Sequence, residues 1–261
     1  MHRIGVFDSG IGGLTVLRQL RRAFPQLDMV YLGDTARVPY GGRSGETITH
    51  YAEDDVRFLL RKDVEAIVIA CGTVSSNSLD ALREKFDLPI NGVIESAARL
   101  AASMTKTRSV GVIGTQATVK SGAYETHIRA IDPGVHVVSR ACPLFVPLVE
   151  NGIAPDDIVA ETVCSRYMEA FDGKNIDALI MGCTHYPVYR PALEKRLPGV
   201  RMIDVGEALA EALRPLFAES GGTGAVEYYV TERSAAFDEI VRVMDPSLDP
   251  AAIRVENAFI Q

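Results

Sequence analysis

Short apolar runs alternate with amphipathic segments along almost the whole chain. The runs have the length and composition of buried parallel strands, and they occupy residues 4–7, 29–32, 66–70, 90–94, 110–115, 135–139, 178–181, 201–204, 226–230 and 253–256. Apolar side chains at helical spacing predict helices at residues 14–24, 45–59, 79–86, 95–104, 117–131, 158–171, 192–197, 207–217 and 236–244. This alternation predicts an α/β fold in which helices cover both faces of parallel sheets.

One segment of the chain repeats an earlier one. Residues 63–73 and 175–185 align as a polar lead-in, an apolar run, a small residue and a cysteine, which puts Cys71 and Cys183 in the same column. Two such units predict two similar doubly wound parallel-sheet domains. The tract at residues 219–224, rich in glycine, is the most linker-like stretch.

Polar side chains follow several of the predicted strands directly. They are Asp8, Ser9, Asp34, Cys71, Thr73, Thr115, Cys183, Thr184 and His185. In a doubly wound sheet, ligands bind at the carboxyl ends of the strands. If the two rims face each other, one cleft between the domains collects all of these side chains, and we expect the active site there.

The paired cysteines suggest acid/base chemistry. A thiol is useful when its thiolate is accessible, which backbone N–H donors, a helix start or a cation favour by lowering its pKa. Cys71 and Cys183 both end an apolar strand and precede an expected helix start, so we expect donors to point at both. Most free cysteines are small buried hydrophobes, and we assign no role to Cys142 or Cys164, which lack this setting.

Two thiols on opposite walls of a cleft suit a racemisation or epimerisation. One thiolate removes a proton from a carbon and the other thiol delivers a proton to the opposite face. Asp8 beside Cys71 and His185 beside Cys183 are candidates to take or share the thiol proton, although an Asp after a strand is often only a helix cap.

Composition excludes several other classes of function. The 261 residues carry a formal net charge of -7 without a cluster of Lys or Arg, which leaves no electrostatic footprint for nucleic acid. No apolar run approaches the ~20 residues of a membrane span, so we expect a cytoplasmic protein with no membrane contact. Four cysteines without a C-x-x-C pair indicate reduced thiols and no metal site.

Nucleotide and pyridoxal chemistry are also disfavoured. The glycine-rich turn at residues 8–13 matches neither phosphate-binding motif, and none of the strand-end clusters contains the lysine that a Schiff base requires. We therefore expect no cofactor.

Four motifs together resemble those of bacterial glutamate racemases, in the cofactor-independent Asp/Glu racemase superfamily. The motifs are FDSGIGG at 7–13, GDTARVPYG at 33–41, ACGT at 70–73 and GCTHYP at 182–187. The resemblance covers nearly the whole chain. It implies interconversion of L- and D-glutamate that supplies D-glutamate for peptidoglycan, and hence a part in cell wall biogenesis and cell shape. It also implies a homodimer, with one domain formed by residues 1–94 and 205–261 and the other by 95–204.

The same resemblance implies roles for individual residues. Cys71 and Cys183 would be the catalytic thiols, assisted by Asp8 and His185. Substrate-binding residues would be Ser9, Pro39, Tyr40, Gly41, Gly72, Thr73 and Thr184. Supporting residues would be Asp34, Glu150, Thr115 and Thr118.

One position departs from the family's pattern. The usual motif after the first cysteine is Cys-Asn-Thr, whereas this chain has Gly72 between Cys71 and Thr73. A lost polar contact can be worth ~1–3 kcal/mol, so either a backbone N–H or a water replaces the Asn, or the substrate differs. Two alternatives therefore stay open: a related racemase for another acidic amino acid, and a catalytically silent ligand-binding or regulatory protein.

Overall fold

The computed structural model describes residues 1–256 and contains two parallel sheets. The six-stranded sheet has the order β10-β9-β2-β1-β3-β4, with β1 (Arg3–Asp8), β2 (Asp28–Gly33), β3 (Ala66–Ile69), β4 (Ile90–Gly92), β9 (Val226–Val230) and β10 (Ile253–Val255). The four-stranded sheet has the order β6-β5-β7-β8, with β5 (Ser109–Gly114), β6 (His136–Ala141), β7 (Ala178–Met181) and β8 (Arg201–Asp204). This confirms the predicted α/β class with two parallel sheets.

Helices follow most strands, as the apolar periodicity predicts. Those that accompany the six-stranded sheet are α1 (Leu14–Ala23), α2 (Gly45–Leu60), α3 (Gly72–Asn77), α4 (Leu79–Lys85), α11 (Val205–Ala212), α12 (Arg214–Phe217) and α13 (Phe237–Met244). The remaining ones are α5 (Val93–Met104), α6 (Gln116–Ser121), α7 (Ala123–Ile131), α8 (Phe145–Glu150), α9 (Ile158–Met168) and α10 (Arg190–Arg196). Short 3₁₀ turns are η1 (Glu169–Phe171), η2 (Tyr186–Tyr189) and η3 (Pro250–Ala252).

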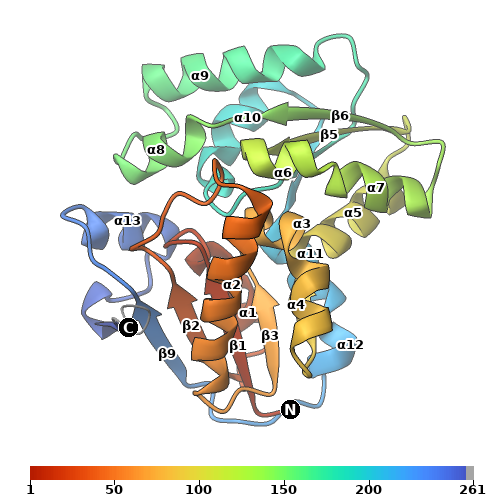
Figure 1. The fold of residues 1–261 in the computed structure, drawn as a ribbon. Coiled ribbons are helices and arrows are strands. Elements are labelled where there is room, and N and C mark those ends of the chain that lie inside the picture. The colour runs from red at the N-terminus through yellow and green to blue at the C-terminus, as the bar shows by residue number, and fades with distance from the viewer. Residues whose placement is uncertain (257–261) are drawn as a thin grey trace.

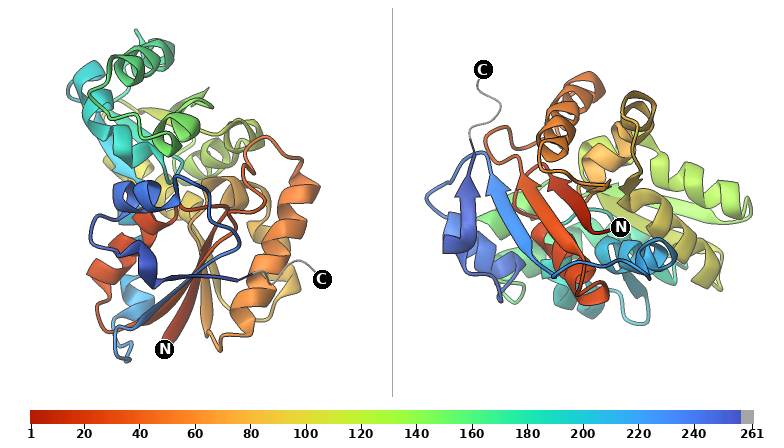
Figure 2. Two further views of the ribbon diagram at one scale, coloured as in Figure 1. Left: turned by 90° about the vertical axis from the view of Figure 1, so that its left-hand side faces the viewer. Right: turned by 90° about the horizontal axis from the view of Figure 1, so that it is seen from below.

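The two ends of the chain meet in one sheet. β9 pairs in parallel with β2, so strands from the C-terminal region lie beside the first strands of the chain (Figures 1 and 2). All four strands of the other sheet come from residues 109–204, and this sheet lies above the first in Figure 1. The domain limits at 94 and 205 remain a prediction, and residues 257–261 of the first predicted domain lie outside the described residues.

Alternation along the strands explains how the six-stranded sheet is covered. Phe7, Leu32 and Ile69 point to the face that packs on α2 and α4, whereas Val6 and Tyr31 point to the opposite face. The apolar core on that opposite face is continuous with the core of the four-stranded sheet. The two sheets therefore share buried contacts instead of being joined only by linkers.

Several element boundaries differ from the expected ones, and the helix expected at 207–217 is divided into α11 and α12. The helix expected at 117–131 is broken at Gly122, whose φ of +67° is left-handed and ends α6 before α7 begins. The strand expected at 90–94 ends at Gly92, because Val93 already starts α5. Ser44 caps α2 as predicted, since its hydroxyl accepts a hydrogen bond from the N–H of Thr47 at 3.2 Å.

The glycine-rich tract at 219–224 is not a linker. One carboxylate oxygen of Asp28 accepts hydrogen bonds from the N–H and hydroxyl of Thr223 at 2.8 and 2.9 Å. The N–H of Gly221 also donates to the carbonyl of Met1. These bonds fix the tract against the start of β2. The tract leads directly into β9, which pairs with β2.

Candidate active site

A cavity of about 310 Å³ lies where the carboxyl ends of β1, β3, β5 and β7 come together. It is lined by Ser9, Gly10, Val38, Pro39, Tyr40, Gly41, Gly42, Cys71, Gly72, Thr73, Thr115, Gln116, Pro143, Val146, Pro147, Glu150, Cys183, Thr184, His185 and Tyr186. Both echoed segments therefore contribute to one site. Its volume suits a small metabolite.

Cys71 stands at the end of β3 as the residue before α3. Its sulfur lies 3.3 Å from the Ser9 hydroxyl, and the N–H of Val74 in the first turn of α3 also points at it. Burial nevertheless raises the pKa of Cys71 to about 12, and the nearby charge of Asp8 raises it further. The expected donors are present, but the expectation that they lower this pKa is wrong because desolvation outweighs them.

Asp8 lies next to Cys71 but is not among the residues that line the cavity. One carboxylate oxygen accepts the N–H of Gly10 at 3.0 Å, and the other is buried without a hydrogen-bond partner among the described residues. Burial raises the pKa of Asp8 above its ordinary value, and the nearby His185 lowers it in part. Its charge reaches the Cys71 thiol from outside the cavity lining.

The opposite wall carries Cys183 and His185. The imidazole is buried and lies 3.1 Å from a carboxylate oxygen of Glu150 at the end of α8. Burial lowers the pKa of His185, but hydrogen bonds with Cys183 and Glu150 outweigh it and raise the pKa to about 10. His185 is therefore an imidazolium at neutral pH, and it lies beside the sulfur of Cys183.

Threonine hydroxyls connect the two sheets at the cavity. Thr73 after β3 and Thr115 after β5 have their hydroxyl oxygens 2.9 Å apart. Thr118 lies 3.0 Å from Thr115 and is buried behind it, outside the cavity lining. Thr184 is held from α1, since the Thr15 hydroxyl donates to its carbonyl at 3.0 Å.

Gly72 allows a close backbone approach between the two cysteine-bearing turns. A Cβ atom built on Gly72 would lie closer than 3.0 Å to the carbonyl oxygen of Gly182, which real Cβ atoms essentially never do, and 4.0 Å from the Cα of Cys183. The glycine is therefore a steric requirement of this packing. From the sequence alone, Gly72 is visible only as the absence of a polar side chain, because the contact with Gly182 joins two distant segments.

Asp34 does not line the cavity but supports the loop that does. It is buried at the end of β2 and accepts hydrogen bonds from Tyr40 and, at 2.5 Å, from Arg37. Arg37 also pairs with Asp54 at 2.9 Å and Asp55 at 3.2 Å on α2. This network fixes residues 38–42 over the cavity, and the structural role of Arg37 was missed from the sequence.

Several lining residues were not predicted. They are Gly10, Val38, Gly42, Gln116, Pro143, Val146, Pro147 and Tyr186. Most of them lie next to a predicted site residue. For Pro143, Val146 and Pro147, the sequence feature that could have indicated the site is the Pro-containing run that ends at Glu150.

Residues 1–256 were also compared with the requirements of a metal site, a cationic ligand site and a membrane span. No group of three or more His, Cys, Asp or Glu side chains there could hold a metal ion. Among these residues, the cavity is lined by no Lys or Arg, so carboxylate groups of a ligand would meet N–H and hydroxyl donors. Within the same range, every helix is too short or too polar to cross a bilayer.

The sequence and the fold of this chain are both similar to those of known racemases. The family profile described as Asp/Glu/Hydantoin racemase matches residues 4–213. A glutamate racemase of Aquifex aeolicus is 46% identical over 242 residues, which are 93% of each chain. The crystal structure of Francisella tularensis glutamate racemase with D-glutamate superimposes with a TM-score of 0.91 at 34% identity, covering 100% of this chain and 99% of that one. The Thermus thermophilus enzyme with β-chloro-D-alanine gives 0.86 at 43% identity, with coverages of 98% and 96%.

Proposed function

Because the chain belongs to the Asp/Glu/hydantoin racemase family, we infer that it is an amino-acid racemase that interconverts L- and D-glutamate. The observation that carries this inference is the convergence of Cys71 and Cys183 on one cavity from two different sheets. The product of the L-to-D direction is D-glutamate for peptidoglycan.

The two walls of the cavity suit opposite roles in one turnover. The Cys183 thiolate, beside the His185 imidazolium, takes the α-proton of the bound enantiomer and leaves a planar carbanion. Cys71, held as a thiol by its raised pKa, gives its proton to the opposite face. The two sulfurs have then exchanged protonation states, so the reverse reaction uses each in the other role.

Hydroxyl and N–H donors bind the substrate carboxylates in this proposal. Ser9, Thr73 and Thr184 surround the two thiols, and the Pro39–Gly41 segment covers them from the loop that Asp34 supports. Glu150 acts through His185, and Thr115 and Thr118 hold Thr73 in place. These assignments rest on geometry and on the family resemblance.

Exchange of the α-proton tests the function directly. The protein is incubated with L- or D-glutamate in D₂O, and α-deuteration and optical rotation are followed together. Both should change from either enantiomer. Exchange with aspartate but not with glutamate would instead identify a related racemase with a different substrate, which the glycine at position 72 would then explain.

The proposal also includes a homodimeric assembly and a cytoplasmic location. The family resemblance supports a homodimer, and sedimentation at micromolar concentration tests it. Four free cysteines support a reducing, cytoplasmic setting. Fractionation of cells that produce the protein tests the location.

A further inference from the structure

A second cavity, of about 410 Å³, lies at the far end of α1 from the thiols. Its lining is Arg18, Arg21, Arg22, Phe24, Pro25, Leu27, Gly224, Asp245, Pro246 and Ser247. Three arginines and one carboxylate give this lining a net charge of about +2 in a protein of net charge -7. Nothing in the racemase reaction uses these groups.

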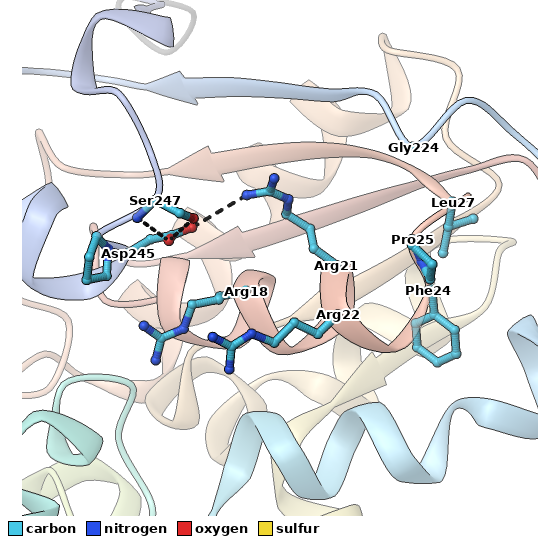
Figure 3. Close-up of a pocket in the computed structure, with 10 residues that line it drawn as sticks. Arg18, Arg21, Arg22, Phe24, Pro25, Leu27, Gly224, Asp245 and Ser247 are labelled. Atoms are coloured by element: carbon cyan, nitrogen blue, oxygen red, sulfur yellow. Dashed lines mark hydrogen bonds and ion pairs between the residues drawn. The ribbon is translucent and has the colours of Figure 1, made fainter.

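The one acidic group is already engaged. Asp245 is fully buried, and one of its oxygens accepts the N–H and the hydroxyl of Ser247 at 3.1 and 2.6 Å. Its other oxygen lies 3.5 Å from the guanidinium of Arg21. Figure 3 shows Arg21 turned toward this carboxylate. Asp245 and Arg21 therefore form an ion pair, although this carboxylate oxygen accepts no hydrogen bond within residues 1–256.

Arg18 and Arg22 have no such partner. Neither forms an ion pair or a side-chain hydrogen bond within residues 1–256, and the Nε of Arg18 is buried without an acceptor. Figure 3 shows both side chains extending from the same stretch of α1 with no dashed line to a neighbour. They are four residues apart on one helix, where like charges repel.

The helix dipole accounts for only part of this arrangement. Cations in the last turn of a helix are favourable, and Arg21 and Arg22 lie there, but Arg18 lies one turn earlier. A buried, unpaired guanidinium nitrogen beside a second unpaired guanidinium has a cost that an anion in the cavity would remove.

We propose that this cavity binds the phosphate group of a small phosphorylated molecule. Guanidinium groups match phosphate oxygens with paired N–H donors, which favours phosphate over a single chloride. Phe24, Pro25, Leu27 and Pro246 supply apolar wall for the rest of such a ligand. The volume lies within the range of small-molecule sites. The proposal does not depend on the racemase activity.

Thermal unfolding and calorimetric titration of the full chain with inorganic pyrophosphate test the site. The wild type should show saturable binding and a midpoint that rises with pyrophosphate beyond the effect of NaCl at equal ionic strength. The double variant Arg18→Gln/Arg22→Gln should lose both effects. The matched control Arg129→Gln removes an arginine that pairs with Glu125 on the surface of α7, and it should keep them.

A second expected result separates loss of binding from loss of fold. Because Arg18 and Arg22 repel each other, the double variant should unfold without pyrophosphate at the same or a higher temperature than the wild type. Arg22→Gln alone, at an exposed position, should weaken pyrophosphate binding at least fivefold. Absence of saturable binding to the wild type overturns the proposal, as does full binding to the double variant. Racemisation of glutamate in the same samples reports separately on the proposed function.

Discussion

Gly72 and Gly182 bring the two cysteine-bearing turns into backbone contact. A Cβ atom on Gly72 would overlap the carbonyl oxygen of Gly182, one residue before Cys183. Cys71 is the residue before Gly72, so this contact sets how far apart the two thiols lie. The glycine that departs from the family's pattern thus has a geometric role.

Gly72→Ala should separate the thiols. We expect at least a tenfold loss of racemisation, because a near-attack geometry tolerates little displacement. Exchange of the α-proton for deuterium should fall less than racemisation. One thiol can still remove the α-proton and return a deuteron to the same face of the α-carbon without the other thiol. Gly42→Ala is the matched control: Gly42 lines the same cavity, but an added Cβ meets nothing within 4 Å. Equal losses in the two variants would contradict the role of Gly72.

Gly72→Asn should also lower activity, although it restores the family's usual residue. The Asn side chain needs the same Cβ, so it cannot enter without moving the turn at Gly182. Steady-state kinetics in both directions measure the effect. A gain in glutamate affinity at unchanged turnover would show that the turn moves at little cost.

Each thiol should be necessary for racemisation. Cys71→Ser and Cys183→Ser replace a thiol by a hydroxyl that is a far weaker acid, and we expect racemisation to fall by about 10²–10⁴-fold. Optical rotation measures the turnover and circular dichroism the fold. Cys164→Ser, at a buried position on α9 outside the cavity, is the control that should racemise normally. Full turnover in either of the first two variants would exclude the two-thiol mechanism.

The basic limb of the pH profile should depend on Glu150. The pKa of His185 is about 10 because hydrogen bonds with Cys183 and Glu150 hold the imidazolium against the effect of burial. Glu150→Gln removes one of these charges and should move the basic limb of kcat/KM to lower pH. An unchanged limb would mean that His185 does not control it.

Stability should follow the same ionisation. The pKa of His185 lies above its ordinary value of 6.5, so its stabilising contribution is complete below about pH 6.5 and is lost as the pH rises through about 10. Urea unfolding between pH 7 and pH 10.5 should show decreasing stability, and the decrease should begin at lower pH in Glu150→Gln. The opposite order would contradict the pairing.

Arg37→Met should be strongly destabilising. It leaves Asp34 and Asp55, both fully buried, without their cation, and removal of one partner from such a network costs about 3–5 kcal/mol. The free energy of unfolding in urea measures this. Arg57→Met is the control, because its pairs with Glu53 and Asp54 are half-exposed and worth at most about 1 kcal/mol.

Patterns in the sequence were sufficient for the sheets and for most of the cavity. Apolar runs predict the central strands because a parallel strand there is buried on both faces, whereas the edge strands β6 and β10 are largely exposed. The similarity between residues 63–73 and 175–185 predicts that Cys71 and Cys183 both lie at carboxyl ends of strands and face one cleft. Both cysteines line the cavity. The family resemblance supplied Pro39, Tyr40, Gly41 and Glu150, whose positions no local pattern indicates.

Other features depend on contacts between distant residues. The raised pKa of Cys71 follows from burial and from Asp8, 63 positions earlier in the chain, so neighbouring residues do not reveal it. The contact of Gly72 with Gly182 likewise joins two turns from different sheets. Arg37 pairs with Asp54 and Asp55 on α2. The sequence around an arginine in a loop does not indicate which carboxylates it will pair with.

The order of strands in the six-stranded sheet also affects the growing chain during synthesis. All four strands of the other sheet have been made once residue 204 is complete, whereas β2 still lacks its neighbour β9 at residues 226–230. Until then β2 has an unpaired edge, which is a template for pairing with other chains. The last segment of the chain therefore closes an aggregation-prone edge after both cysteine-bearing strands have already been made.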